Sequence, residues 1–181
     1  MLISAAAMND SSLSLQLTPA TEHDLPLILD FVRELAEYEK LAHQVTATVP
    51  LLRASLFGPD AVAAAVIARV GDAPAGFALY FFTFSTFLAK PGLYLEDLYV
   101  RPAWRKRGIG RALLAHLARI AVERECGRME WSVLNWNELA LGVYRAIGAK
   151  PMTEWTVQRL TGTALTALAA TAPAVPESSD R

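Results

Sequence analysis

The sequence predicts a mixed α/β or α+β fold in which a central sheet is flanked by helices. Segments with strand patterns first come in a run and then alternate with segments that have helix patterns, an order typical of a layered architecture. Hydrophobic residues make up 53% of the chain and charged residues 19%, which is the composition of a folded domain and not of a disordered chain. With 181 residues, the chain is long enough for one domain with a sizeable core and too short for two ordinary ones.

The first half of the chain predicts three strands and two helices. Apolar and polar residues alternate in the string LSLQL at 13–17, which is the pattern of a short strand. Thr21 and Asp24 have the spacing of a near capping box, and the apolar stripe that begins at Leu27 continues through Tyr38, which predicts a helix. We further expect a helix at 50–57 and strands at 62–69 and 75–84, with a Gly-Asp turn at 71–72.

The second half predicts strands that alternate with helices. The string LYLEDLYV at 93–100 is typical of a central strand, and Pro102 ends it. A helix is expected from Arg111, because the apolar residues that follow share one helical face, and Gly127 suits the position just after its end. The remaining expectations are a strand at 129–134, a helix capped by Asn137 that runs to Gly148, a last strand at 155–160, and a terminal helix or interface edge in TGTALTALAATA at 161–172.

Both ends of the chain are predicted to be flexible tails, at 1–12 and 173–181, around one globular unit at 13–172. The first residues lack the basic region and the long apolar stretch of a signal peptide, and no apolar run reaches the length of a membrane span. Met8 is an alternative to Met1 as the first residue of the protein.

Charge and residue counts narrow the expected partners. The net charge of -1 argues against a nucleic-acid-binding protein, which usually needs a clearly basic domain. The single cysteine, Cys126, excludes a disulfide within the chain and favours a reducing, cytoplasmic setting. His23, His43 and His116 are scattered and match no ligand spacing. We therefore expect no metal, no nucleic acid and no membrane partner.

The string RKRGIG at 105–110 predicts an anion site where a strand meets the start of a helix. The first N–H groups of a helix have no partner within it and carry a partial positive charge, while glycines allow close approach of a phosphate. A solvated basic turn is the alternative. The chain has no P-loop string, and a dinucleotide fingerprint would need Gly or Ala where Leu113 stands. The pattern present is R-x-x-G-x-G, from Arg105 to Gly110.

With this pattern, the sequence resembles the GNAT family of N-acetyltransferases, and within it the diamine acetyltransferase group. The resemblance covers nearly the whole globular unit and implies a single GNAT-type domain with a central mixed, twisted sheet. Lys106 stands where many members of the family carry a glycine. Four strings carry the match, in order: ELAEYEKL at 34–41, LYLEDLYV at 93–100, RKRGIG at 105–110 and VLNWNELALGVYRAIGA at 133–149.

The resemblance implies that acetyl-CoA is the co-substrate and indicates the residues that hold it. The main chain after the acidic pair of the central strand would bind the pantetheine arm, and the glycine-rich turn would bind the pyrophosphate. Asn137 is expected to cap its helix and also to contact the coenzyme. The expected coenzyme residues are Leu98, Tyr99, Val100, Arg105, Lys106, Arg107, Gly108, Ile109, Gly110, Arg111 and Asn137.

Acetyl transfer to an amine needs a neutral nucleophile and a proton for the departing thiolate. A lysine-type amine, with a pKa of ~10.4, is neutral only to about one part in a thousand near neutral pH, so a base or a site that lowers the pKa of the amine is required. The resemblance implies that Tyr144 is the general acid and that Glu96 contacts the amine and can relay its proton. Strand alternation places Glu96 and Asp97 on opposite faces, and Asp97 has either a substrate or a structural role.

The resemblance also implies that Tyr38 and Glu39 line a groove for the amine, together with Glu96 and Asp97. An aromatic ring with carboxylates suits a cation, although a solvated helix end is the alternative interpretation of ELAEYEKL. The expected function is direct acetyl transfer, in a ternary complex, to a polyamine or to a thialysine-like or lysine-like amino acid by a homodimer. Alternatives are a protein N-terminus or a xenobiotic amine as acceptor, or an acyl-CoA sensor without turnover.

Overall fold

The computed structural model describes residues 14–173, and the chain divides into two compact units after Val143. The predicted tail at 1–12 lies outside the described residues, and so does the predicted tail at 173–181 apart from Pro173. The globular limits at 13–172 therefore remain a prediction.

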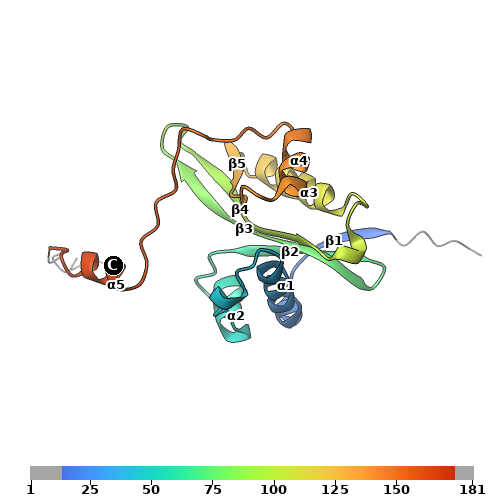
Figure 1. The fold of residues 1–181 in the computed structure, drawn as a ribbon, viewed down its shortest axis with the longest axis horizontal. Coiled ribbons are helices and arrows are strands. Elements are labelled where there is room, and N and C mark those ends of the chain that lie inside the picture. The colour runs from blue at the N-terminus through green and yellow to red at the C-terminus, as the bar shows by residue number, and fades with distance from the viewer. Residues whose placement is uncertain (1–13, 174–181) are drawn as a thin grey trace, which may run out of the picture. The chain divides into compact units, whose positions relative to one another are not determined.

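A mixed sheet of five strands forms the centre of the larger unit in the part of the chain that the structure describes (Figure 1). Neighbours are antiparallel from β1 to β4, whereas β4 and β5 are parallel. A parallel pair needs a crossover, which here contains a helix, so the predicted class of sheet and helices is confirmed. The strands, in their spatial order, are β1 (Leu15–Pro19), β2 (Ala64–Val70), β3 (Ala73–Ser85), β4 (Lys90–Val100) and β5 (Arg128–Trp131).

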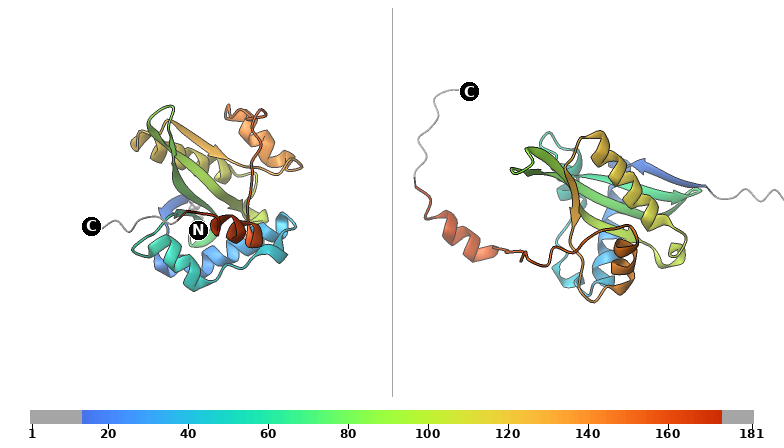
Figure 2. Two further views of the ribbon diagram at one scale, coloured as in Figure 1. Left: turned by 90° about the vertical axis from the view of Figure 1, so that its left-hand side faces the viewer. Right: turned by 90° about the horizontal axis from the view of Figure 1, so that it is seen from above.

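Helices cover both faces of this sheet (Figures 1 and 2). On one face lie α1 (Leu25–Tyr38) and α2 (Val49–Phe57), and α3 (Ile109–Glu123) lies on the other. The fully buried Phe31 of α1 stacks on Phe77 of β3 with 5.2 Å between ring centroids. On the other face, α3 buries Leu113 and Leu117 completely. Removing these apolar side chains from water is the main driving force that holds the layers together.

A register shift interrupts the pairing of β3 with β4. Leu79 lies opposite Asp97 and Tyr80 lies opposite Leu95, so Glu96 is the extra residue of a bulge. Because neighbours along β3 alternate between faces, Leu95 and Asp97 lie on opposite faces of the sheet. The strict alternation expected for this strand is therefore wrong at Glu96.

The bulge determines which face of the sheet each side chain of β4 occupies after Glu96. Beyond it, Leu98 and Val100 lie against Gly110 of α3. Tyr99 points to the other face and joins the core that includes Phe31, and Asp97 shares that face. The acidic side chain of Asp97 is thereby on the face of α1, while Leu98 and Val100 lie on the face of α3.

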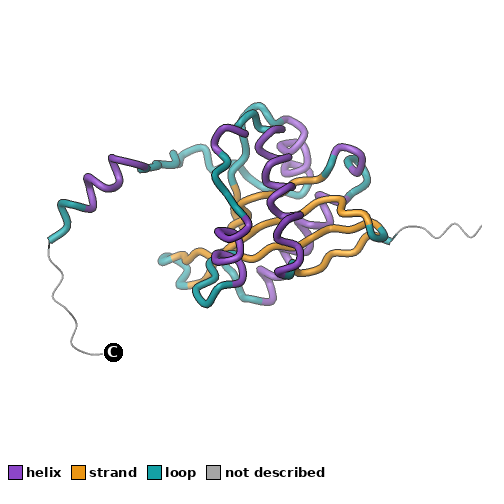
Figure 3. Tube along the Cα trace, turned by 90° about the horizontal axis from the view of Figure 1, so that it is seen from below, coloured by secondary structure: helices purple, strands orange, loops and turns teal. Residues whose placement is uncertain are grey.

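Most of the predicted elements are confirmed with shifted ends (Figure 3). Thr21 and Asp24 form the expected capping box, which caps the short helix η1 (Glu22–Asp24) that leads into α1. Two further 3-10 turns are η2 (Ala42–Gln44) and η3 (Pro102–Trp104). The fourth helix, α4 (Glu138–Ala146), begins where Asn137 was expected to cap it.

The smaller unit differs from prediction in one element. The strand expected at 155–160 is wrong, because these residues have no strand pairing and Trp155 and Val157 are 73% and 77% exposed. A strand requires a neighbour for its backbone groups, and the alternation of side chains does not reveal whether one is available. The helical alternative for 161–172 is confirmed by α5 (Gly162–Ala169).

Candidate active site

The junction of β4 and α3 presents the start of a helix to solvent. Gly108 has φ of 79°, and no other part of the described chain lies within 4 Å of the point where a side chain would begin. The first backbone hydrogen bond of α3 runs from the Ala112 N–H to the Gly108 carbonyl at 2.9 Å. The N–H groups of Ile109, Gly110 and Arg111 precede it, and they lie at the positive end of the helix dipole. This geometry fits a phosphate group.

Three basic side chains surround this helix start, on what we call the basic loop (residues 105–110) and the first turn of α3. Lys106, Arg107 and Arg111 are all exposed. The Arg107 guanidinium lies 5.0 Å from the centroid of the Trp104 ring. Lys106 has φ of 61°, a left-handed conformation that is costly for a residue with a side chain, so the loop keeps a glycine-like backbone there.

Arg105 behaves differently from its neighbours on the basic loop. Its Nε donates a hydrogen bond to the Val100 carbonyl at 2.9 Å. Its guanidinium carbon lies 4.7 Å from the centroid of the Tyr38 ring and 5.6 Å from that of Tyr99. The sequence reasoning that grouped Arg105 with the phosphate-binding residues missed these contacts, which depend on the position of α1.

The edge of β4 is open beyond its pairing with β5. The parallel ladder joins Gly92–Leu95 to Arg128–Trp131 and includes no residue of β4 after Leu95. Backbone groups of Leu98–Val100 on this edge have no strand beside them in the described residues. An extended ligand arm can add to such an edge by main-chain hydrogen bonds, so these residues fit the predicted pantetheine site.

Three carboxyl groups lie close enough to influence one another's charge where the bulge of β4 approaches the end of α1, and we call Glu39, Glu96 and Asp97 the acidic cluster. Burial raises the pKa of Asp97 to about 6, and the negative charges of Glu96 and Glu39 act in the same direction. Burial also raises the pKa of Glu39. Glu96 is exposed at the bulge. The structure thus brings together three of the four predicted substrate residues.

Tyr38, the fourth, links the end of α1 to the start of α4. Its hydroxyl donates to Asn137 Oδ1 at 3.2 Å, and the same oxygen accepts a hydrogen bond from the Ala140 N–H at 3.2 Å. The second bond confirms the predicted helix-capping role of Asn137. The Trp136 ring, half exposed, lies 5.7 Å from the Tyr38 ring between centroids. Sequence reasoning did not single out Trp136, although its place beside Asn137 in the string VLNWN was a signal.

Tyr144 is the one predicted site residue that belongs to the smaller unit. It lies near the end of α4 and is half-buried. Its carbonyl accepts hydrogen bonds from the N–H groups of Ile147 at 3.3 Å and Ala149 at 3.0 Å, which close the helix before Gly148. The role expected for its hydroxyl remains a prediction.

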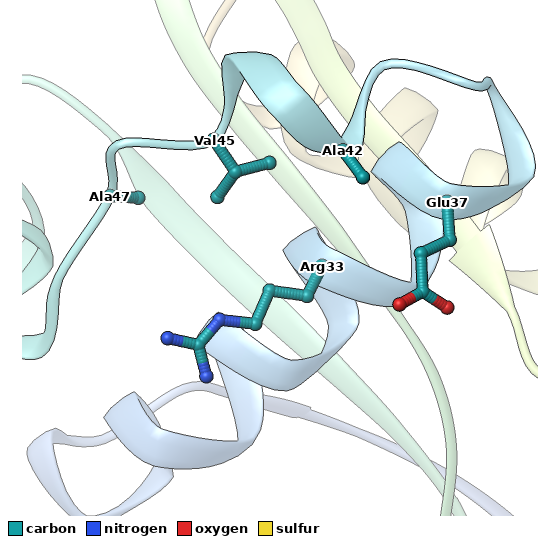
Figure 4. Close-up of a pocket in the computed structure, with 5 residues that line it drawn as sticks. All are labelled: Arg33, Glu37, Ala42, Val45 and Ala47. Atoms are coloured by element: carbon teal, nitrogen blue, oxygen red, sulfur yellow. The ribbon is translucent and has the colours of Figure 1, made fainter.

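A cavity of about 260 Å³ lies apart from these residues, beside α1 (Figure 4). Arg33 and Glu37 both project from α1 beside it, and the segment around η2 closes the other side. Its lining includes none of the predicted site residues. The lining residues are Arg33, Glu37, Ala42, Val45 and Ala47.

Residues 14–173 contain no group of three or more His, Cys, Asp and Glu side chains that could hold a metal ion. Within the same residues, no helix combines the length and the apolar character needed to span a membrane.

Known proteins are similar to this chain in sequence and in fold. A model of the acetyltransferase (GNAT) family matches residues 29–149. Thialysine N-epsilon-acetyltransferase of Bos taurus is 38% identical over 161 residues, which are 83% of this chain and 94% of that protein. L-ornithine N5-acetyltransferase of Arabidopsis thaliana is 30% identical, over 82% of this chain and 85% of that protein. An integron cassette protein from the mobile metagenome of V. cholerae has a similar structure, with a TM-score of 0.73 and 29% identity, over 87% of this chain and 99% of that chain.

Proposed function

This chain belongs to the acetyltransferase (GNAT) family, whose members use acetyl-CoA, and is an N-acetyltransferase; we propose that its acceptor is the primary amine of a small cation, a polyamine or a lysine-like amino acid such as thialysine. The observation that carries this proposal is the acidic cluster beside two aromatic rings. A relative named for thialysine and another named for L-ornithine, both amino acids with a side-chain amine, favour the amino acid over the polyamine.

The cluster matches a positively charged acceptor in charge. A lysine-type amine carries a proton at neutral pH, with a pKa of ~10.4, and is attracted to carboxylates. Glu39 follows the last residue of α1, and its negative charge acts on Asp97 of β4. Trp136, which is half exposed beside the Tyr38 ring, offers a ring face that attracts cations and shields a methylene chain from water. An acceptor of this kind would lie with its amine toward β4.

The reaction needs a base before attack, and two carboxyl groups can serve. Asp97 has the raised pKa, about 6, which makes it a better proton acceptor near neutrality than an ordinary carboxylate. Glu96 is the residue that the family resemblance favours, and its exposure at the bulge suits contact with the incoming ammonium. We assign proton acceptance to Asp97 and substrate contact to Glu96, with the reverse assignment as the alternative.

Coenzyme and amine would be held by different residues of the larger unit that share strand β4. The start of α3, with Lys106, Arg107 and Arg111, fits the pyrophosphate, and the open edge at Leu98–Val100 fits the pantetheine arm. The acidic cluster is built from other side chains. Both ligands can therefore be held at once, which supports direct transfer in a ternary complex.

The transfer step conserves atoms and charge. The ammonium gives one proton to the carboxylate, and the lone pair of the neutral nitrogen attacks the thioester carbonyl. The carbon–sulfur bond breaks as the amide forms, and the thiolate takes a proton from a general acid. The nitrogen gives up its second proton in the same collapse, and this proton restores the general acid. We propose that Tyr144, in α4, is this general acid, because its place in the string GVYRAIGA is that of the general acid in the family. The products are an N-acetyl amine and coenzyme A with a free thiol.

We further propose that the protein works as a homodimer. Several large apolar side chains of the smaller unit are exposed, and a second copy of the chain, which the family resemblance implies, would cover them. Those between residues 152 and 168 are Met152, Trp155, Val157, Leu160, Leu165 and Leu168.

The proposed function is tested by following coenzyme A release from acetyl-CoA with a thiol reagent. The panel of acceptors holds thialysine, lysine, ornithine, spermidine, putrescine and an aminoglycoside. We expect release that depends on the amine and is greatest with one of the amino acids. Tyr144→Phe should lower kcat by about 10²- to 10⁴-fold, the usual contribution of a general acid. Release that no amine stimulates would contradict the small-amine proposal and would favour a protein acceptor or a sensor.

A further inference from the structure

Building on the proposed function, we propose that Arg105 is a positioning residue for acetyl transfer and not a ligand of the coenzyme phosphates. In this role it couples the basic loop to the ends of α1 and α4 through Tyr38. We call Arg105, Tyr38 and Asn137 the Tyr38 cluster.

The polar contacts of Arg105 are directed into the protein. Its Nε donates a hydrogen bond to the Val100 carbonyl at 2.9 Å. This bond closes the turn between β4 and the basic loop. Its guanidinium carbon lies within cation–π distance of both Tyr38 and Tyr99, at 4.7 and 5.6 Å from their ring centroids. Arg105 is half-buried, whereas Lys106 and Arg107 beside it are exposed. A phosphate that approaches from solvent can therefore be neutralised without Arg105.

Tyr38 joins three elements through one phenol group. Its ring lies against the Arg105 guanidinium, and its hydroxyl donates to Asn137 Oδ1 at 3.2 Å. That oxygen also caps α4 through the Ala140 N–H. A displacement of the ring would disturb the basic loop and the start of α4 together.

The same phenol lies next in the chain to the acidic cluster. Glu39 follows Tyr38 directly, and its charge acts on Asp97. A change at Arg105 that lets Tyr38 move would therefore alter binding of the amine, which Arg105 does not contact in this proposal. A role as a phosphate ligand makes the opposite prediction, since it would change binding of acetyl-CoA alone.

Arg105→Lys separates these two roles, because lysine keeps the positive charge but loses the planar guanidinium. We expect the KM for the amine to rise about tenfold, the size of a lost partly buried cation–π contact. The dissociation constant of acetyl-CoA, measured by calorimetry without amine, should change by less than about threefold. The amine KM is measured at saturating acetyl-CoA.

Tyr38→Phe removes the hydrogen bond to Asn137 and keeps the ring under Arg105. We expect a lower kcat and a higher amine KM, with the dissociation constant of acetyl-CoA unchanged. Tyr38→Leu removes the ring as well. In a protein that already carries Tyr38→Leu, Arg105→Lys should raise the amine KM by less than about twofold, because the effects of substitutions at coupled residues do not add.

Arg124→Lys is the matched control. The Arg124 guanidinium lies over an aromatic ring in the same way, 5.1 Å from the centroid of Phe82, but outside the proposed site. This variant should leave the amine KM and the dissociation constant of acetyl-CoA as they are in the unaltered protein.

The proposal is overturned if Arg105→Lys weakens acetyl-CoA binding tenfold or more while the amine KM stays constant. Additive effects of Arg105→Lys and Tyr38→Leu on the amine KM would also overturn it. If Arg105→Lys does not fold, unchanged kinetics of Tyr38→Phe would decide against the cluster. If no amine stimulates release of coenzyme A by the unaltered protein, the proposed function fails. The Tyr38 cluster is then tested by measuring the free energy of unfolding of the same variants. Additive losses of stability in Arg105→Lys and Tyr38→Leu would reject the coupling.

Discussion

Asp97 differs from its neighbours on β4 because its carboxyl group is largely shielded from water. The bulge at Glu96 turns the Asp97 carboxyl toward the end of α1, where Glu39 and Glu96 add negative charge. Desolvation and like charges both favour the protonated form, and they raise the pKa of Asp97 to about 6. A residue in this state costs stability when it ionises, and a carboxyl group with a raised pKa beside other carboxyl groups is a candidate for a role in binding or catalysis.

Asp97→Asn should make the enzyme slower and the fold more stable. We expect kcat/KM to fall by about 10²-fold or more if Asp97 is the base. In the unaltered protein kcat/KM should rise with pH through about 6, as Asp97 loses its proton, and the variant should lack this rise. Glu96→Gln should keep it. Loss of the rise in Glu96→Gln instead would move the role of base to Glu96.

The raised pKa of Asp97 also makes the stability of the fold depend on pH. Because the pKa of Asp97 is raised on folding, the folded state binds more protons than the unfolded state between about pH 4 and 6, and stability falls as the pH rises through this range. At pH 8 we expect Asp97→Asn to raise the free energy of unfolding by about 1–3 kcal/mol. Urea unfolding at pH 8 and at pH 4 measures this, and the gain should shrink at pH 4. Destabilisation at pH 8 would indicate a structural hydrogen bond.

Among the elements, the turn from β4 into α3 combines an open helix start with a glycine that has a positive φ. Gly108 has φ of 79°, and its surroundings are empty in the described residues. An alanine there meets no protein atom, so its cost within the protein is limited to the backbone, about 1–2 kcal/mol. Any further effect must come from the ligand that approaches the helix.

Gly108→Ala should therefore weaken acetyl-CoA binding beyond its effect on stability. We expect the dissociation constant to rise about tenfold or more, since a methyl group would stand where a phosphate approaches the backbone. Gly148→Ala is the matched control, because Gly148 has φ of 84° and equally empty surroundings. Calorimetric titration and thermal unfolding of both variants check this. Equal affinities in the two variants would place the pyrophosphate elsewhere.

The accuracy of prediction from sequence also varied with the element. The apolar stripes of α1 and α3 predicted those helices, because each buries one face, and the string around β4 located the acidic pair. The bulge at Glu96 was not predicted, since it depends on the register with β3. The place of Arg105 on Tyr38 was not predicted either, because it joins residues that are far apart in the sequence. The strand expected at 155–160 failed because pairing requires a partner that alternation does not reveal.

On the scale of the whole molecule, several large apolar side chains of the smaller unit are exposed to solvent. In the described part of this unit, Trp155 is 73% exposed and Val157 is 77% exposed. Covering such side chains contributes about 1.5–3 kcal/mol each when burial is complete. A second copy of the chain is the partner that the family resemblance implies.

We expect the protein to elute as a dimer in size-exclusion chromatography with light scattering, and Trp155→Asp should shift it toward the monomer. A charge placed in an apolar interface loses hydration without gaining a partner, which weakens association strongly. Val122→Asp is the matched control, because Val122 lies on α3 in the larger unit and is 77% exposed there. It should leave the dimer intact. A monomer in the unaltered protein would contradict the dimer, and equal dissociation by both variants would place the interface on α3 as well as on the smaller unit.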